Sequence, residues 1–317
     1  MKMDRIDNTL LDAVDGRTRL AGSNRMEILL FSLGTGETFG INVFKVREVS
    51  KTPFITKSPN MPAGVEGLIS LRGNVIPVLA LAKILQLDDR ASEQGGSMMV
   101  TEYSKRTLGF LVHEVDRIIR VDWENVHSPD NVSGGAQGYV TAITEMPDGK
   151  LVSILDVETI LANTFGEGAI GHIDPLGGSE TVNVFFVDDS AVARRKIAEV
   201  LDKLGVQHKH AVNGLEAWTR LEGMAGHAQQ TGRDLRRDLD LILVDAEMPE
   251  MDGYVLTRNI KNDARFEGIP VVMHSSLSSE ANRAMGKRVG VDGYIAKFDA
   301  DVLADTLRPM LLKPAKG

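Results

Sequence analysis

Short stretches in which apolar residues alternate with polar or small ones recur through the first half of the chain. In residues 39–43 and 108–112 every second residue is apolar, which places those side chains on one face of a strand. The expected strands are 28–33, 39–43, 67–81, 98–103, 108–115, 118–122, 139–145 and 151–155. Gly, Pro and Asn interrupt them, so this half is predicted to be mostly β and to form small barrels.

The pattern changes after about residue 180 to apolar runs that alternate with helical stretches. The runs are 182–187, 206–212, 239–244, 269–273 and 293–296, and the last helix is expected at 300–312. Ser190 is placed to cap the first helix and Gly205 to end it. Five consecutive βα units predict a parallel sheet with helices on both faces and chemistry at the carboxyl ends of its strands.

A glycine-rich segment separates the two patterns. Residues 163–180 contain five glycines and one proline, a composition that resists helix and strand and favours a linker. The predicted organisation is an N-terminal extension at 1–23, a β domain at 24–162, the linker at 163–180 and an α/β domain at 181–315.

Composition excludes several classes of function. The 317 residues include 36 basic and 44 acidic side chains, a formal net charge of −8, so a general polyanion binder is disfavoured and no nucleic-acid partner is expected. The absence of cysteine excludes disulfides and thiolate metal sites and suits a reducing cytoplasm. No apolar stretch is long enough to span a bilayer, so we expect a cytoplasmic protein without direct membrane insertion.

Five polar residues stand where predicted strands of the second half end. They are Asp188, Asp189, Asp245, Ser275 and Lys297. Each alone is an ordinary cap, turn former or surface residue, but strand ends of a parallel sheet converge on one edge. Three close carboxylates need a cation between them, and Mg²⁺ prefers such oxygen ligands. The lysine and the hydroxyl would supply donors for phosphoryl oxygens.

Residues 185–190, 243–253, 271–276 and 293–297 resemble the motifs of the response regulator receiver domain. The resemblance covers about residues 181–315 and implies a flavodoxin-like (βα)5 fold that takes a phosphoryl group from a phosphohistidine. It maps the family's site onto the phosphoacceptor Asp245, the magnesium ligands Asp188, Asp189, Asp245 and the Glu247 backbone carbonyl, and the phosphoryl-contact and switch residues Ser275, Tyr294 and Lys297. The domain would catalyse its own phosphorylation, autodephosphorylation is left open, and no other enzyme activity is expected.

Three features depart from the receiver pattern, and one of them is Glu247, which places a further carboxylate near the route of attacking water. Phe298 stands where the family usually has proline after the conserved lysine, and residues 223–238 lengthen the segment before the third strand, where we expect an exposed loop. A haloacid-dehalogenase-type phosphatase is a weaker alternative. Its signature has a second Asp two residues after the nucleophile, whereas Glu247 occupies that position after Asp245.

Residues 39–49 and 64–79 resemble the CheW-type coupling domain of chemotaxis systems, over about residues 24–162. The resemblance implies two small five-stranded barrels, with Val46, Glu48 and Arg72 at positions that contact chemoreceptor tips or the histidine kinase CheA. The alternative is that Val46 is a core residue and the other two form an exposed pair of little energetic consequence. Ala80 stands where this family commonly has Asp.

A CheW-like domain followed by a receiver resembles the CheV family. The implied function is a chemotaxis scaffold that couples chemoreceptors to CheA within receptor arrays and is tuned by phosphorylation of Asp245. A phosphate sink for CheA and a constitutive structural coupler remain alternatives. A transcription factor is disfavoured because no DNA-binding module follows Leu312.

Overall fold

The computed structural model describes residues 25–87, 96–103, 106–127, 138–166, 170–177, 181–276, 280–297 and 299–312. The predicted N-terminal extension and Phe298 lie outside these ranges. The chain divides into two compact units, Met1–Asp122 with Glu145–Ile154, and Trp123–Thr144 with Leu155–Gly317. In the described part of the chain no helix has the length and hydropathy needed to cross a membrane.

One sheet of the β-rich first half has five strands. Its order is β3 (Val46–Lys51), β6 (Ser97–Tyr103), β7 (Arg106–Val112), β5 (Asn74–Ala80) and β4 (Val65–Leu71). Alternate residues from these strands, among them Ile76, Val78, Met98 and Val100, form its hydrophobic core. A short helix, α2 (Leu81–Ile84), follows β5.

The other sheet of this half has six strands. Its order is β8 (Glu114–Asp122), β1 (Arg25–Ser32), β2 (Thr38–Asn42), β11 (Leu151–Leu155), β10 (Val140–Glu145) and β9 (Val126–His127). The two-residue strand β9 adds one strand to the five expected. After β11 comes α3 (Val157–Phe165), whose N-cap Asp156 accepts a hydrogen bond from the Thr159 N–H at 3.0 Å.

The predicted strand 67–81 is wrong as a single element, because the structure has two strands there. Leu71 pairs with Asn74, so Arg72 and Gly73 form a two-residue hairpin loop with φ values of 50° and 87°. Positive φ at both central residues is typical of the tight type I′ turn, which usually contains Asn-Gly. The Arg-Gly pair is a weaker turn signal than Asn-Gly, which is why the sequence pattern predicts one continuous strand here.

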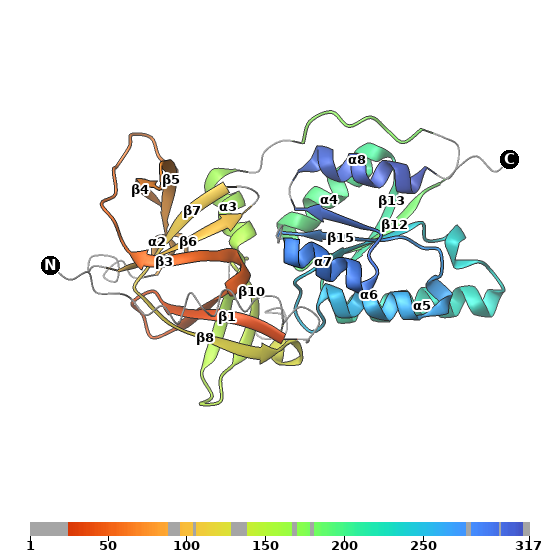
Figure 1. Ribbon diagram of the computed structural model, residues 1–317, viewed down its shortest axis with the longest axis horizontal. Coiled ribbons are helices and arrows are strands. Elements are labelled where there is room, and N and C mark those ends of the chain that lie inside the picture. Colours follow the sequence, from red (N-terminus) through yellow and green to blue (C-terminus); the bar gives the residue numbers. More distant parts are fainter. Residues whose placement is uncertain are drawn as a thin grey trace. The chain divides into compact units, whose positions relative to one another are not determined.

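The predicted parallel sheet and its five βα units are confirmed (Figure 1). The strand order is β13 (Gln207–Ala211), β12 (Asn183–Val187), β14 (Leu241–Asp245), β15 (Val271–Ser275) and β16 (Gly293–Ala296). The helices are α4 (Ala191–Leu204), α5 (Gly214–Thr231), α6 (Gly253–Asn262), α7 (Glu280–Val289) and α8 (Ala300–Leu311). We call this part of the structure the receiver.

Side chains that alternate along β12 enter two hydrophobic cores, one on each face of the sheet. Phe185 and Val187 of β12 pack with residues of α5 and α6, whereas Val184 and Phe186 pack with residues of α4 and α8. Figure 1 accordingly shows α4 and α8 on one face of the sheet and α5 and α6 on the other. The strand order changes direction between β12 and β14, the point where open α/β sheets place their sites.

The expected exposed loop at residues 223–238 is wrong for most of its length. Helix α5 continues to Thr231, and Ala225 and Ala228 lie in the core of the receiver. A 3-10 turn, Leu235–Arg237, then buries Leu235. Ala225 and Ala228 are three residues apart and lie on the same buried face of α5 as Leu221. Burial of these small side chains stabilises the helix through a segment whose other residues are mostly polar.

We expect Gly253→Ala to destabilise the receiver, because a Cβ at Gly253 would lie 1.9 Å from the carbonyl oxygen of Asp245. The cost should be about 1–3 kcal/mol, as for other overpacked sites. The control is Gly223→Ala in α5, where a Cβ meets nothing within 4 Å and helix propensity should add about 0.5–1 kcal/mol of stability. Urea unfolding followed by helical circular dichroism measures both, and equal midpoints for the two variants would contradict the expectation.

Candidate functional site

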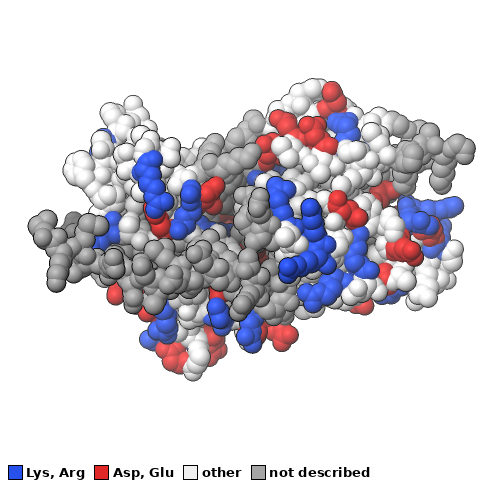
Figure 2. All heavy atoms as spheres, in the orientation of Figure 1, with Lys and Arg blue, Asp and Glu red and all other residues white. Residues whose placement is uncertain are grey.

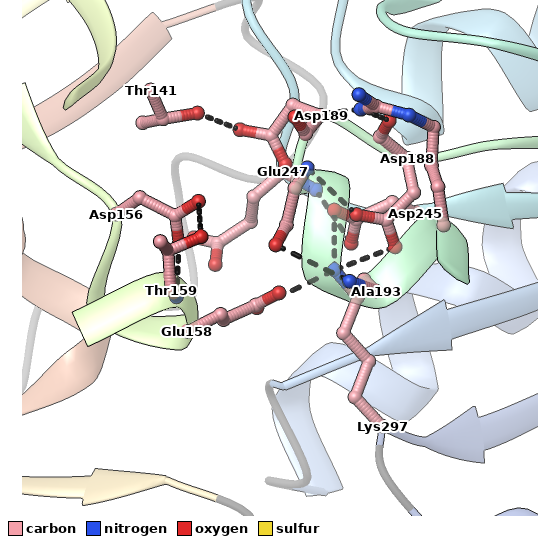
Figure 3. Close-up of polar contacts among 12 residues, drawn as sticks. Thr141, Asp156, Glu158, Thr159, Asp188, Asp189, Ala193, Asp245, Glu247 and Lys297 are labelled. Atoms are coloured by element: carbon pink, nitrogen blue, oxygen red, sulfur yellow. Dashed lines mark hydrogen bonds and ion pairs between the residues drawn. The ribbon is translucent and has the colours of Figure 1, made fainter. Parts of the chain in front are cut away.

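Residues from three strand ends of the receiver meet at one edge of the sheet (Figure 3). The carboxylate oxygens of Asp188, Asp189 and Asp245 include atoms that all lie within 4.8 Å of one another. Lys297 follows β16 and reaches the same point. We call these four residues the acidic cluster; Asp189 is half-buried and the other three are buried.

Lys297 is the cation that the carboxylates surround. Its Nζ lies 2.7 Å from Asp245 Oδ2 and 2.9 Å from Asp188 Oδ2. Its backbone N–H donates to the carbonyl oxygen of Ser275 at 2.8 Å, which ties the loop after β16 to the end of β15. Burial opposes the charge on Lys297, but the carboxylates, Asp188 foremost, raise its pKa well above the usual value.

The carboxylates themselves are held in an environment that disfavours their charge. Burial raises the pKa of Asp188 to about 7 and the pKa of Asp245 well above its ordinary value, while Lys297 acts in the opposite direction. Asp189 and other nearby carboxylates add to the rise. Three carboxylates beside one ammonium leave an excess of negative charge, and hard oxygen donors in this number fit Mg²⁺.

The loop after β12 is held by contacts that orient Asp188. Its Oδ1 accepts a hydrogen bond from the Ser190 N–H at 3.0 Å, and Ser190 caps α4 as predicted. Arg194 donates to the carbonyl oxygens of both Asp188 and Asp189 at 2.8 Å. Sequence reasoning missed Arg194; its signal is its position one turn into the helix that begins beside the two aspartates.

Ser275 and Tyr294 lie next to the acidic cluster. Ser275 is fully buried at the end of β15. Burial raises the pKa of the Tyr294 hydroxyl above its usual value, and the neighbouring Ser275 and Tyr254 hydroxyls act against this rise. The Arg283 guanidinium of α7 stands over the Tyr294 ring at 5.3 Å. Tyr254, which follows Gly253 in α6, is a further site residue that the sequence analysis missed.

The predicted coupling residues lie together in the five-stranded sheet. Val46 is buried at the start of β3. Glu48 and Arg72 form an ion pair in which the Arg72 side chain is 74% exposed and the Glu48 side chain 19% exposed. This geometry is also the one expected for a core valine beside a surface pair, so the docking role stays a prediction.

Comparison with known families finds two domain families that match successive parts of the chain. The CheW-like domain family matches residues 27–165, and the response regulator receiver domain family matches residues 184–308. The chain therefore joins a CheW-like domain to a receiver domain.

Two relatives match this chain over most of their length. Chemotaxis protein CheV3 of Helicobacter pylori (strain ATCC 700392 / 26695) is 32% identical over 281 residues, 87% of this chain and 89% of that protein. Chemotaxis protein CheV1 of the same strain is 30% identical, over 90% of this chain and 94% of that protein. The chain belongs to the CheV family of chemotaxis proteins.

Among solved structures, the scaffolding protein TtCheW from Thermoanaerobacter tengcongensis is similar to part of this chain. It is 30% identical and matches 43% of this chain and 87% of that chain, with a TM-score of 0.40.

We predict that His274 makes the stability of the receiver sensitive to acid. His274 is buried in β15 beside Asp245, and burial, followed by the charge of Lys297, lowers its pKa to about 3. The unfolded chain takes up a proton near pH 6.5 while the folded one does not. Stability is therefore complete above pH 6.5 and falls as the pH drops toward 3, by at most about 1.4 kcal/mol per pH unit.

The comparison that isolates this effect is wild type against His274→Gln, which keeps a polar side chain but does not titrate. Urea unfolding at pH 7, 6 and 5 should show the wild type losing stability relative to the variant at each step. A constant difference between the two proteins across this range would disprove the assignment.

Proposed function

We propose that this CheV-family protein couples chemoreceptors to the histidine kinase CheA in receptor arrays, and that phosphorylation of Asp245 tunes the coupling. The observation that carries the proposal is the contact between Lys297 Nζ and Asp245 Oδ2 inside a cluster of carboxylates. It provides a nucleophile, an adjacent cation and oxygen ligands at one point. The CheW-like match on the same chain supports the coupling role.

Asp245 is the proposed nucleophile toward a phosphohistidine. One carboxylate oxygen attacks phosphorus, the P–N bond breaks, and its electron pair leaves with the imidazole, which takes up a proton. The Lys297 ammonium, already beside Oδ2, then contacts an oxygen of the transferred group. When bound to Asp188, Asp189, Asp245 and the Glu247 backbone carbonyl, Mg²⁺ would supply positive charge for the phosphoryl oxygens.

Ser275 and Tyr294 are the proposed switch. A phosphoryl group on Asp245 offers new acceptors to the Ser275 hydroxyl, which otherwise bonds the Tyr294 hydroxyl. A change at Tyr294 also alters its contact with Arg283.

Arg283 belongs to a basic surface over α6 and α7 (Figure 2). Its exposed members are Arg258, Lys261, Arg283, Lys287 and Arg288. We propose that this surface receives an acidic segment of the kinase, because its charge is complementary.

Two alternatives differ in what the phosphoryl group does. A phosphate sink would drain CheA, and a constitutive coupler would not turn over. In receptor arrays, Asp245→Ala should raise phosphoryl flow to other regulators if the receiver is a sink. The carboxylate cluster around Lys297 would have no role in a constitutive coupler, and this disfavours that alternative.

Asp245→Asn should abolish phosphoryl transfer to this protein, because an amide oxygen is a poor nucleophile and the product acyl phosphate cannot form. The measurement is the transfer of ³²P from phosphorylated CheA in the presence of Mg²⁺. Asp305→Asn, an exposed change on α8, is the matched control and should accept label at the wild-type rate. Wild-type labelling of the Asp245 variant, or no label on the wild type, would overturn the proposal.

Arg72→Ala should weaken docking of the CheW-like domain. Loss of an interface arginine commonly costs about 1–2 kcal/mol, which is roughly a 5- to 30-fold rise in Kd. Calorimetric titration with purified CheA and with a chemoreceptor tip fragment measures it. Arg117→Ala on β8, another exposed arginine beside a carboxylate, is the control. If Arg72→Ala leaves the Kd of both partners at the wild-type value, the assignment of this surface is wrong.

A further inference from the structure

One side chain that contacts the acidic cluster, Glu158, comes from outside the receiver motifs and outside the strand ends of the parallel sheet. Glu158 lies in the first turn of α3, and its Oε1 is 3.6 Å from Lys297 Nζ. The Glu158 and Lys297 side chains are 3% and 2% exposed. Figure 3 shows Glu158 and Asp245 approaching the Lys297 ammonium from different sides. Helix α3 belongs to the same compact unit as the receiver.

A second contact comes from β10, in the same unit. The Thr141 hydroxyl donates to Asp189 Oδ2 at 2.7 Å. Two residues outside the receiver sequence therefore contact the acidic cluster: Glu158 contacts the Lys297 ammonium, and Thr141 contacts the Asp189 carboxylate. Asp156, the N-cap of α3, brings a further buried carboxylate, and its charge interacts with those of Glu158 and Asp189.

The contact at Lys297 has a consequence for phosphorylation. A phosphoryl group on Asp245 needs the Lys297 ammonium, and this ammonium already faces Asp188, Asp245 and Glu158. The incoming group is an anion, so Glu158 repels it as well as competing with it for the same cation. A buried glutamate without its lysine partner is in turn strongly disfavoured.

We propose that Glu158 and α3 form an intramolecular cap on the acidic cluster, and that capping and phosphorylation of Asp245 exclude each other. The inference rests on the proposed phosphorylation of Asp245. By thermodynamic linkage, if the cap makes phosphorylated Asp245 less stable, a phosphoryl group on Asp245 weakens the cap by the same free energy and so releases α3. The modification is then transmitted to α3 and β10 directly, in addition to the route through Tyr294.

The test uses the full chain, Mg²⁺ and acetyl phosphate, a small donor that needs no kinase docking. Glu158→Gln keeps the shape of the side chain and removes its charge, and we expect the initial phosphorylation rate to rise at least about fivefold. Thr141→Val removes the second contact and should give a smaller rise. Glu145→Gln, an exposed glutamate at the end of β10, should leave the rate unchanged.

Hydrogen exchange of the α3 amides gives a readout that does not depend on turnover. Exchange in Val157–Phe165 should be faster in Glu158→Gln than in wild type, and should rise in wild type when Mg²⁺ and beryllofluoride, a phosphoryl mimic, are added. Unchanged rates together with unchanged exchange in both cap variants would overturn the cap. Absence of phosphorylation in all variants would instead reject the proposed function, while exchange in Glu158→Gln would still decide whether the contact holds α3.

Discussion

The burial of one ammonium among several carboxylates is the constraint on which the site depends. Lys297 loses its hydration at the end of β16, and only partners as close as Asp188 and Asp245 offset that loss. Each aspartate is equally dependent on the lysine, because burial alone raises the pKa of both. The cluster offers three carboxylates beside one ammonium, a set of hard oxygen donors that suits a divalent cation.

The fold supplies this arrangement through strand order. Placing β12 between β13 and β14 brings Asp188 and Asp245 to adjacent strand ends, and β15 and β16 then add Ser275 and Lys297 in register. The close approach at Gly253 holds the backbone of Asp245 against the first turn of α6.

Helix α3 ends where the CheW-like match ends, and the receiver match begins at residue 184. The CheW-like match runs to residue 165, yet α3 is part of the compact unit that contains the receiver. Helix α3 therefore belongs to the CheW-like domain by sequence and to the receiver's compact unit by structure. In sequence it ends the CheW-like match, and in the structure its Glu158 contacts Lys297 of the receiver.

Local sequence was sufficient wherever periodicity and capping decide the structure. The five βα units, the Ser190 cap and the strand-end positions of Asp188, Asp245 and Lys297 follow from short-range patterns, since side-chain period and backbone sterics act over a few residues. The hairpin at Arg72 and Gly73 was missed because its turn residues are atypical.

Tertiary structure alone decided the contacts that join distant parts of the chain. The continuation of α5 depends on alanines that are helical because they are buried, not because their neighbours are apolar. Glu158 and Lys297 are 139 positions apart, and nothing local to either predicts that they meet. Such pairs are selected by the packing of whole elements, because an ion pair is stable in the interior only where folding has already removed both groups from water.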